Sequence, residues 1–324
     1  MSKMSGVFLI GLWGVLLFWG CSNTPNDPAV TDPEVAVEDL AADEENDYLY
    51  DLGLDDQVEE NMYVGYSSYS SDPQIPAITV DSTIRFGRKI NRRAVRRVVV
   101  ERLAPDTLLV RTRRDLAGFF FVFHQTDSAT WRGFRKPMHH IAERSAIYVN
   151  TGSRDTDNRR NWQLQAVSLG SGRSATDASI RIHSVTVLYN NGADTLGFRN
   201  PAETYISRGN VPTFRSGEEV VVRVRLANNT ANPVDPDGSG ATEQLLLHYG
   251  AHRGDKARTQ FRYVGNDPAT GLQIYEGRWR VHESRGNLHQ AIIDGIDNGT
   301  IYERDATVYP YNSSHWSIPY RVVD

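Results

Sequence analysis

Apolar and polar residues alternate with a period of two over much of the chain beyond residue 80, as they do in β-strands with one buried face. At 220–226, apolar residues at the even positions alternate with a valine and two arginines at the odd positions. Residues 180–189 alternate in the same way, except for one change of phase near Ser184, which predicts a β-bulge. The alternation therefore predicts a mainly β body.

Short turn sequences separate the alternating runs. Pro105-Asp106 lies between VVVERL and TLLVRT, Asn191-Gly192 lies between VTVLY and TLGF, and NDPATG lies between FRYV and LQIYEG. Such spacing is typical of hairpins, so we expect antiparallel pairing. Helical periodicity is confined to residues 131–141, where a short helix is predicted.

The body divides by pattern near residue 200. A proline-containing loop sequence follows Arg199 and leads into the alternating run at 220–226. The strand rhythm over 201–324 resembles the layout of immunoglobulin-like β-sandwiches, without their buried cysteine pair. We therefore predict two antiparallel β-sandwich-like domains, at 81–200 and 201–324.

Charge separates this body from the residues before it. Residues 22–84 hold 16 Asp and Glu and no Lys or Arg, whereas residues 85–324 hold 34 basic and 24 acidic groups. A segment of one charge sign buries too little apolar surface to offset the entropy lost on ordering. Residues 21–80 are therefore predicted to be a disordered acidic tether.

The chain begins with a 14-residue apolar run, Gly6 to Trp19, after the single cation Lys3. As a helix it is about 21 Å long, too short for the roughly 30 Å hydrocarbon core of a bilayer. This length is typical of a signal peptide. It ends in Phe18-Trp19-Gly20-Cys21, which resembles the lipobox of bacterial lipoproteins.

The lipoprotein resemblance implies that residues 1–20 are removed and that Cys21 becomes an acylated N-terminus. It also implies a membrane partner at the cell envelope, and Ser22 after the cysteine implies sorting to the outer membrane. Cys21 is the only cysteine, so it has no disulfide partner within the chain. The alternative is an ordinary signal peptide with an incidental cysteine.

The densest basic stretch is RFGRKINRRAVRR at 85–97. Its candidate anion-binding residues are Arg88, Arg92, Arg93, Arg96 and Arg97. Three interpretations stay open: a charged strand edge that discourages edge-to-edge pairing, a partner for the acidic tether, or a site for an external polyanion. Only one aromatic residue is interleaved, so no nucleic acid is expected.

The C-terminal stretch is rich in aromatic residues. Tyr309, Tyr311, Asn312 and Trp316 are candidate glycan-binding residues, because flat rings stack on sugars and amides bond their hydroxyls. The alternative is that these rings pack in the core of a closing strand. Exposed, coplanar rings favour a polysaccharide partner, and buried rings favour a scaffold.

Signals for a metal or for catalysis are weak. Asp235 and Asp237, with Glu243 nearby, form a calcium candidate that lacks the first ligand and the final spacing of an EF-hand loop, so a polar turn is the alternative. No cofactor is predicted. The chain has no GxSxG, SxxK, HExxH or P-loop motif.

The sequence therefore predicts a lipid-anchored envelope protein with a non-catalytic structural or binding role, whose partner is an envelope protein or a polysaccharide. The alternatives are a polysaccharide-binding module and an unrecognised hydrolase, and the second of these requires converging carboxylates or a Ser-His pair.

Overall fold

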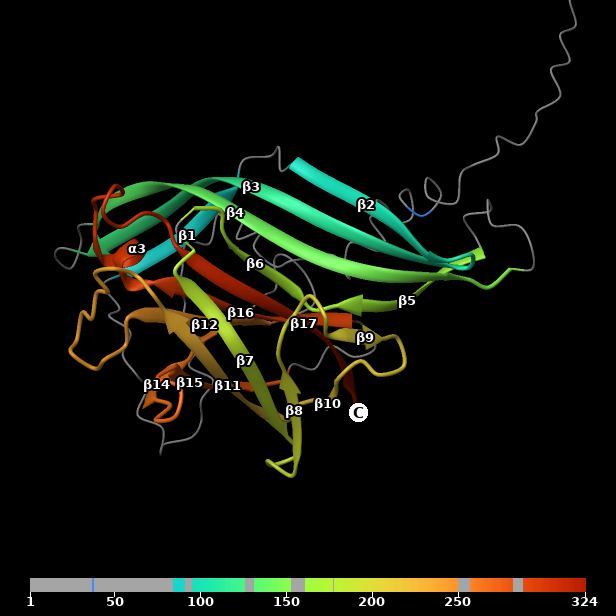
Figure 1. Cartoon of the computed structure of the whole chain (residues 1–324). Coiled ribbons are helices and arrows are strands. Elements are labelled where there is room, and N and C mark those ends of the chain that lie inside the picture. Colours follow the sequence, from blue (N-terminus) through green and yellow to red (C-terminus); the bar gives the residue numbers. More distant parts are fainter. Residues whose placement is uncertain are drawn as a thin grey trace, which may run out of the picture.

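The computed structural model describes Val37 and residues 84–90, 95–125, 131–152, 161–176, 178–249, 257–281 and 288–324. These residues form two β-sheets that pack face to face, as Figure 1 shows. The larger sheet is curled into a half-barrel, and the smaller sheet covers part of its outer side.

The larger sheet contains twelve strands among the described residues, and its main path runs β1-β3-β4-β6-β17-β16-β12-β13. Its strands are β1 (Ile84–Ile90), β2 (Val95–Ala104), β3 (Thr107–Gln125), β4 (Trp131–Asn150), β5 (Trp162–Ser168), β6 (Gly170–Ser174), β9 (Tyr205–Ser207), β10 (Thr213–Arg215), β12 (Glu243–Tyr249), β13 (Ala257–Gln260), β16 (Leu288–Asp297) and β17 (Ser313–Val323). Strands β1 and β2 pair with successive parts of the same edge of β3.

The smaller sheet has five strands among the described residues, in the order β14-β15-β11-β7-β8. They are β7 (Ile180–Tyr189), β8 (Asp194–Phe198), β11 (Glu219–Asn228), β14 (Arg262–Asn266) and β15 (Gln273–Arg280). A short helix, α3 (Asn298–Tyr302), joins β16 to the segment before β17 and is N-capped by the Asp297 side chain.

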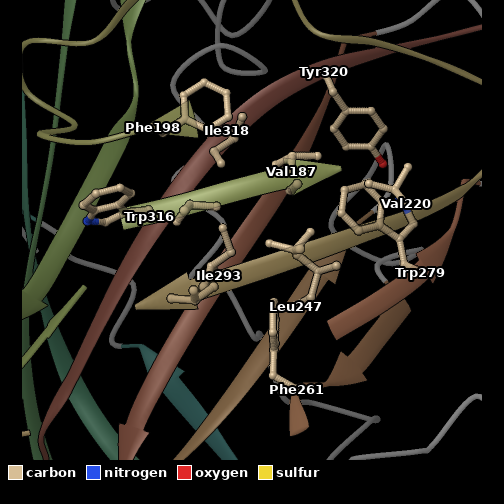
Figure 2. Close-up of a cluster of buried hydrophobic side chains, with 14 of the residues drawn as sticks. Val187, Phe198, Val220, Leu247, Phe261, Trp279, Ile293, Trp316, Ile318 and Tyr320 are labelled. Carbon is tan, nitrogen blue, oxygen red and sulfur yellow. The ribbon is translucent and has the colours of Figure 1, made fainter. Parts of the chain in front are cut away.

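The main apolar core lies between the two sheets. Val187, Val220 and Trp279 enter it from the smaller sheet, and Ile293 and Trp316 enter it from the larger one, as Figure 2 shows. Since side chains alternate along a strand, the residues between these core positions on β16 and β17 face the opposite way. That second face lies inside the half-barrel.

Strand β4 lines the inside of the half-barrel with its even-numbered residues. From Lys136 to Tyr148 every even position is buried, whereas the odd positions are exposed or half-buried. The buried face of β4 carries Lys136, His140 and Arg144 at every fourth residue. The curl thus encloses polar side chains between β4 and the covered strands β16 and β17.

The predicted mainly β character is confirmed, together with several local features. The turn sequences at Pro105-Asp106, Asn191-Gly192 and NDPATG each connect two paired strands. The register between β7 and β11 shifts beside Ser184, where the bulge was predicted. The even positions at 220–226 are buried and the odd positions are exposed or half-buried, as their alternation predicts.

The predicted helix at 131–141 is wrong, because these residues begin strand β4. Phe134, Met138 and Ile141 have helix-like spacing, but β4 pairs with β3 in continuous register from Trp131 to Val149. Tertiary pairing over that length outweighs a weak local preference.

The predicted domain boundary at residue 200 falls between β8 and β9. Strands from both sides of it pair in each sheet, since β7 pairs with β11, β5 with β9 and β6 with β17. The independent folding of 81–200 and 201–324 stays a prediction. The predicted signal peptide, Cys21 and the predicted tether apart from Val37 lie outside the described residues.

Candidate functional site

A buried ion pair crosses the interior of the half-barrel. Arg88 on β1 donates from Nη1 to Oδ2 of Asp294 at 2.5 Å and from Nη2 to Oδ1 at 2.8 Å. Both side chains are at most 2% exposed. This geometry is bidentate, the strongest form of an arginine–carboxylate contact. The pair ties the edge strand β1 to β16, which is 206 residues away in the chain.

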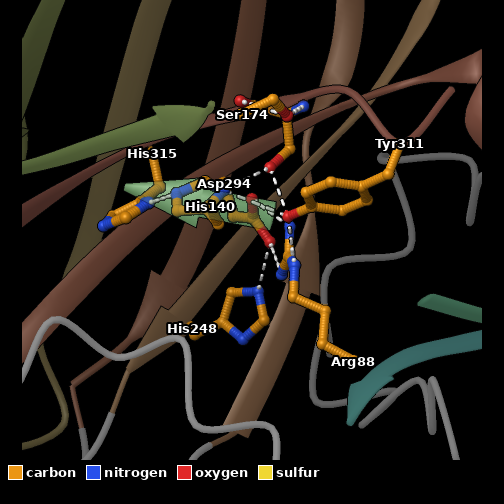
Figure 3. A network of polar contacts seen from close by, with 8 residues as sticks. Arg88, His140, Ser174, His248, Asp294, Tyr311 and His315 are labelled. Atoms are coloured by element: carbon orange, nitrogen blue, oxygen red, sulfur yellow. Dashed lines mark hydrogen bonds and ion pairs between the residues drawn. The ribbon is translucent and has the colours of Figure 1, made fainter. Parts of the chain in front are cut away.

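Tyr311 extends this ion pair toward β4, as Figure 3 shows. Its hydroxyl accepts a hydrogen bond from Arg88 Nε at 2.8 Å and lies 3.2 Å from Nδ1 of His140. It is also 2.7 Å from Oγ of Ser313, whose backbone N–H donates to Ser174 Oγ at 2.9 Å. The tyrosine therefore connects the ion pair to the strands β4, β6 and β17.

Two stacked imidazoles continue the network. His140 Nε2 lies 3.0 Å from His315 Nδ1, and the ring centroids are 5.0 Å apart. Both rings are fully buried. Burial lowers the pKa of His315 to about 3, against the attraction of Asp294 and with repulsion from Arg88. Burial, His315 and Arg88 together hold the pKa of His140 well below its usual range. Both rings are therefore neutral at pH 7.

Asp294 is the charged centre of the network. Burial alone raises the pKa of a carboxyl group, but the Arg88 guanidinium outweighs burial here, with help from His248, and holds the pKa of Asp294 well below its usual range. Nε2 of His248 lies 3.5 Å from Oδ2 of Asp294. The site thus holds one compensated ion pair beside the neutral imidazoles of His140 and His315.

Gly172 leaves the space in which the two imidazoles meet. It lies opposite His315 in the β6–β17 register and opposite Ala142 in the β4–β6 register. A Cβ atom at this position would lie 2.7 Å from Nε2 of His140 and 2.7 Å from the carbonyl oxygen of Ile141, and closer still to the His315 ring. A backbone atom and two packed rings cannot all move away.

We therefore expect Gly172→Ala to lower the free energy of unfolding by about 1–3 kcal/mol through overpacking. The matched control is Gly197→Ala on β8, where a Cβ meets nothing within 4 Å. We expect that control to change stability by about 0.5 kcal/mol or less. Urea denaturation of both variants measures the difference. Equal midpoints would show that the two rings do not share the space above Gly172.

A second buried polar cluster lies at the C-terminal end of β16, three residues beyond Asp294. Glu243 and Asp297 face each other in the β12–β16 register, and Nδ2 of Asn228 donates to both, at 3.2 and 3.1 Å. Burial raises the pKa of Glu243 to about 7, against its hydrogen bonds from Thr242 and Asn228 and with repulsion from Asp297. Burial also raises the pKa of Asp297. At neutral pH this pair can hold a proton between the two carboxylates.

The calcium candidate residues separate into two environments. Asp235 and Asp237 lie on an exposed loop, where they accept hydrogen bonds from the backbone N–H groups of Gly240 and Ser239. Glu243 is 1% exposed and belongs to the Asp297 cluster. Across the described parts of the chain, no group of three or more His, Cys, Asp or Glu side chains is placed to hold a metal ion.

The candidate glycan-binding residues are mainly buried. Tyr311 is 3% exposed, Asn312 4% and Trp316 5%, while Tyr309 is half-buried. Tyr311 points into the ion-pair network, and Trp316 points into the core on the other side of β17. Rings on opposite sides of one sheet cannot form a single platform, and buried rings offer no face to a sugar. Their burial favours the scaffold alternative.

The candidate anion-binding residues divide between the two faces of the larger sheet. Arg88 is buried against Asp294, and Arg96 is half-buried on the inner side. Arg97 is on the outer side, with 69% of its side chain exposed and Asp115 at 3.8 Å. Arg92 and Arg93 lie outside the described residues. Arg88 was therefore among the predicted anion-binding residues, but in the structure it forms a buried ion pair with Asp294.

Sequence reasoning did not identify Asp294, His140 or His315 as interacting residues. The sequence does carry one indication of such residues. It is a charged or imidazole side chain at a position where the alternation of a strand calls for an apolar one, as in AIIDGID. Such a residue must be paired when it is buried. The pattern locates the residue, whereas only the folded sheet shows its partner.

Neither a protein-family model nor a curated protein matches this chain. Among the described residues, no helix combines the length and the apolar character that crossing a membrane requires.

Proposed function

We propose that this protein is a lipid-anchored component of a bacterial cell envelope, exported to the outer membrane, with a non-catalytic binding or structural role. The observation that carries the proposal is the apolar run Gly6–Trp19, which is followed after Gly20 by the only cysteine of the chain, Cys21. An acylated cysteine at the new N-terminus is a stable anchor when it carries two or more acyl chains.

The polar clusters of the body support a non-catalytic role. A catalytic group must contact its substrate, and the candidate acid–base residues Asp294, His140, His315 and Glu243 are each at most 1% exposed. Arg88 and Asp294 compensate each other, which is typical of an ion pair that fixes the packing of strands. We also propose that the body acts as one unit, because strands from both sides of residue 200 share both sheets.

The anchor is tested by expressing the full chain in a Gram-negative bacterium and by analysing its mature N-terminus by mass spectrometry. We expect the mature chain to begin at Cys21 with an added acyl mass and to partition into detergent. The Cys21→Ser variant should lose the acyl mass, whereas the control Ser22→Ala should keep it. A mature chain that begins elsewhere with a free thiol would contradict the proposal.

A further inference from the structure

Val37 is buried against strands of the larger sheet, although it comes from the predicted tether. It is 0% exposed and packs in an apolar cluster, here termed the β2–β5 cluster. The other buried members of this cluster are Leu108, Val110, Ala146, Tyr148, Trp162 and Val167. Among the described residues these members all come from β3, β4 and β5, with Val98 and Val100 of β2 at the margin.

The smaller sheet contributes no described residue to the β2–β5 cluster. Its strands pack instead on the core around Trp279 and Trp316. Val37, which is 47 positions before Ile84, therefore contributes apolar contacts on a part of the larger sheet that lies outside that core. Removing the valine side chain from water favours this contact through the hydrophobic effect.

Arginines border the β2–β5 cluster on the same face of the sheet. Arg96 on β2 lies directly opposite Arg114 on β3, and the next inward row pairs Val98 with Thr112. Because these are even-numbered positions, they share the face that carries Val100 and Val110. The margin of the cluster is therefore positively charged, and opposite charges attract at close range.

The sequence around Val37 has the complementary chemistry. Residues 33–45, PEVAVEDLAADEE, contain six acidic residues and no basic one. Val35, Val37 and Leu40 are the large apolar residues of this stretch. An apolar centre with acidic flanks matches an apolar cluster with an arginine margin.

We propose that residues 33–45 of this chain are the intramolecular ligand of the β2–β5 cluster, with Val37 as the apolar anchor and acidic side chains facing Arg96 and Arg114. Docking of this segment sets the length of free chain between Cys21 and the folded body. This second part rests on the proposed lipid anchor at Cys21, whereas the docking itself does not.

The change in length follows from chain statistics. From Cys21 to Val37 there are 16 residues, and from Cys21 to Ile84 there are 63. A flexible chain spans about 5–6 Å times the square root of its length, which gives about 20–24 Å for the docked tether and about 40–48 Å for the released one. A partner that displaces the segment would thus double the distance over which the body reaches from the membrane.

A peptide competition tests the docking. A fluorescent synthetic peptide of residues 30–46 is titrated against the full mature chain in detergent, as wild type, Val37→Asp and the control Val58→Asp. Val58 lies in the same acidic region. We expect the peptide to bind the Val37→Asp chain at least tenfold more tightly than the other two chains, because only its cluster is vacated. A peptide that itself carries Val37→Asp should not bind.

Equal peptide binding by wild type and Val37→Asp, or binding by neither, would overturn the proposal. Circular dichroism melting of each chain shows whether Val37→Asp still folds, and the uncharged variant Val37→Ser replaces it if it does not. The arginine contacts are tested in the Val37→Asp background. Arg96→Gln should weaken peptide binding several-fold, whereas the control Arg223→Gln, on the smaller sheet, should not.

The tether length is measured separately on the lipidated protein in phospholipid vesicles. A dye is attached to an introduced cysteine at the exposed position Thr195, and energy transfer to a membrane dye reports its distance. Val37→Asp should increase that distance about twofold relative to Val58→Asp. An unchanged distance would overturn the length inference alone. A protein without lipid on Cys21 would refute the proposed function, whereas the peptide result would still decide the docking.

Discussion

Replacing Asp294 by alanine should lower the free energy of unfolding by about 3–5 kcal/mol, because it leaves a buried positive charge without its partner. Arg88 is 1% exposed and gives both of its terminal nitrogens to this carboxylate. The guanidinium cannot lose its proton at accessible pH. The edge strand β1 must therefore either keep an uncompensated charge inside the half-barrel or detach from β16 to hydrate it.

The comparison variant is Asp267→Ala, which removes a single-contact ion pair nearer the surface. Arg225 Nε lies 3.0 Å from Oδ2 of Asp267, but 37% of the Arg225 side chain is exposed. Exposed pairs contribute about 0–1 kcal/mol. Guanidinium chloride denaturation compares the two variants. If Asp294→Ala costs no more than Asp267→Ala, the Arg88 pair does not hold β1 to β16.

A double substitution separates the loss of the pair from the loss of packing. Arg88→Met with Asp294→Leu removes both charges and keeps apolar volume, so we expect it to recover most of the stability that Asp294→Ala loses. Recovery would identify the unpaired charge as the cause of the loss. A double variant as unstable as Asp294→Ala would instead point to the hydrogen bonds with Tyr311 and His248.

Local pattern predicted the mainly β character and several of the turns, but it assigned a helix to residues 131–141, which begin strand β4. Alternation fixes which face of a strand a residue occupies, so it could separate the buried even positions of β11 from its odd positions. It could not show that both faces of β17 are buried. One face packs on the smaller sheet through Trp316, and the other contacts β4 through His315. That two-sided burial depends on the curl of the larger sheet, which is a property of the assembled strands.

The candidate site was predictable only in part for the same reason. Arg88 was recognised as part of an arginine-rich stretch, but its partner Asp294 is 206 residues away. No local pattern encodes a strand register at that separation. The sequence left open whether Tyr311 and Trp316 bind a glycan or pack in the core, because closeness in sequence does not show which side of a strand each ring occupies. Tyr311 and Trp316 point to different sides of β17.

The stability of the protein should fall as the pH is lowered from about 6.5 toward 4. The unfolded chain binds protons at His140 and His315 with an ordinary pKa of about 6.5. In the folded state burial lowers the pKa of His315 to about 3 and also lowers that of His140. Over this window the unfolded state therefore holds more protons, and the free energy of unfolding decreases by up to about 1.4 kcal/mol per pH unit for each histidine.

Glu243 has the opposite effect on the pH dependence of the unfolding free energy. Its pKa in the folded state is raised to about 7, so the folded protein holds a proton that the unfolded chain releases above about pH 4.5. That contribution is present at low pH and is lost as the pH rises through 7. Asp297, whose pKa is also raised, adds to it. The pH dependence of the wild-type unfolding free energy thus contains opposing contributions from two histidines and a carboxylate pair. Single substitutions separate these contributions.

We expect His315→Gln to flatten the dependence of unfolding free energy on pH between 4.5 and 6.5 by up to about 1.4 kcal/mol per pH unit, and Glu243→Gln to steepen it by a similar amount. His139→Gln is the control, because 53% of that side chain is exposed on the outer side of β4. Urea unfolding at half-unit pH intervals gives each slope. Since a substitution that only loosens packing shifts the whole curve without tilting it, the slope isolates the buried proton sites from general destabilisation. Parallel curves for wild type and His315→Gln would mean that the imidazole pair takes up protons in the folded state, and that the half-barrel interior is open to water.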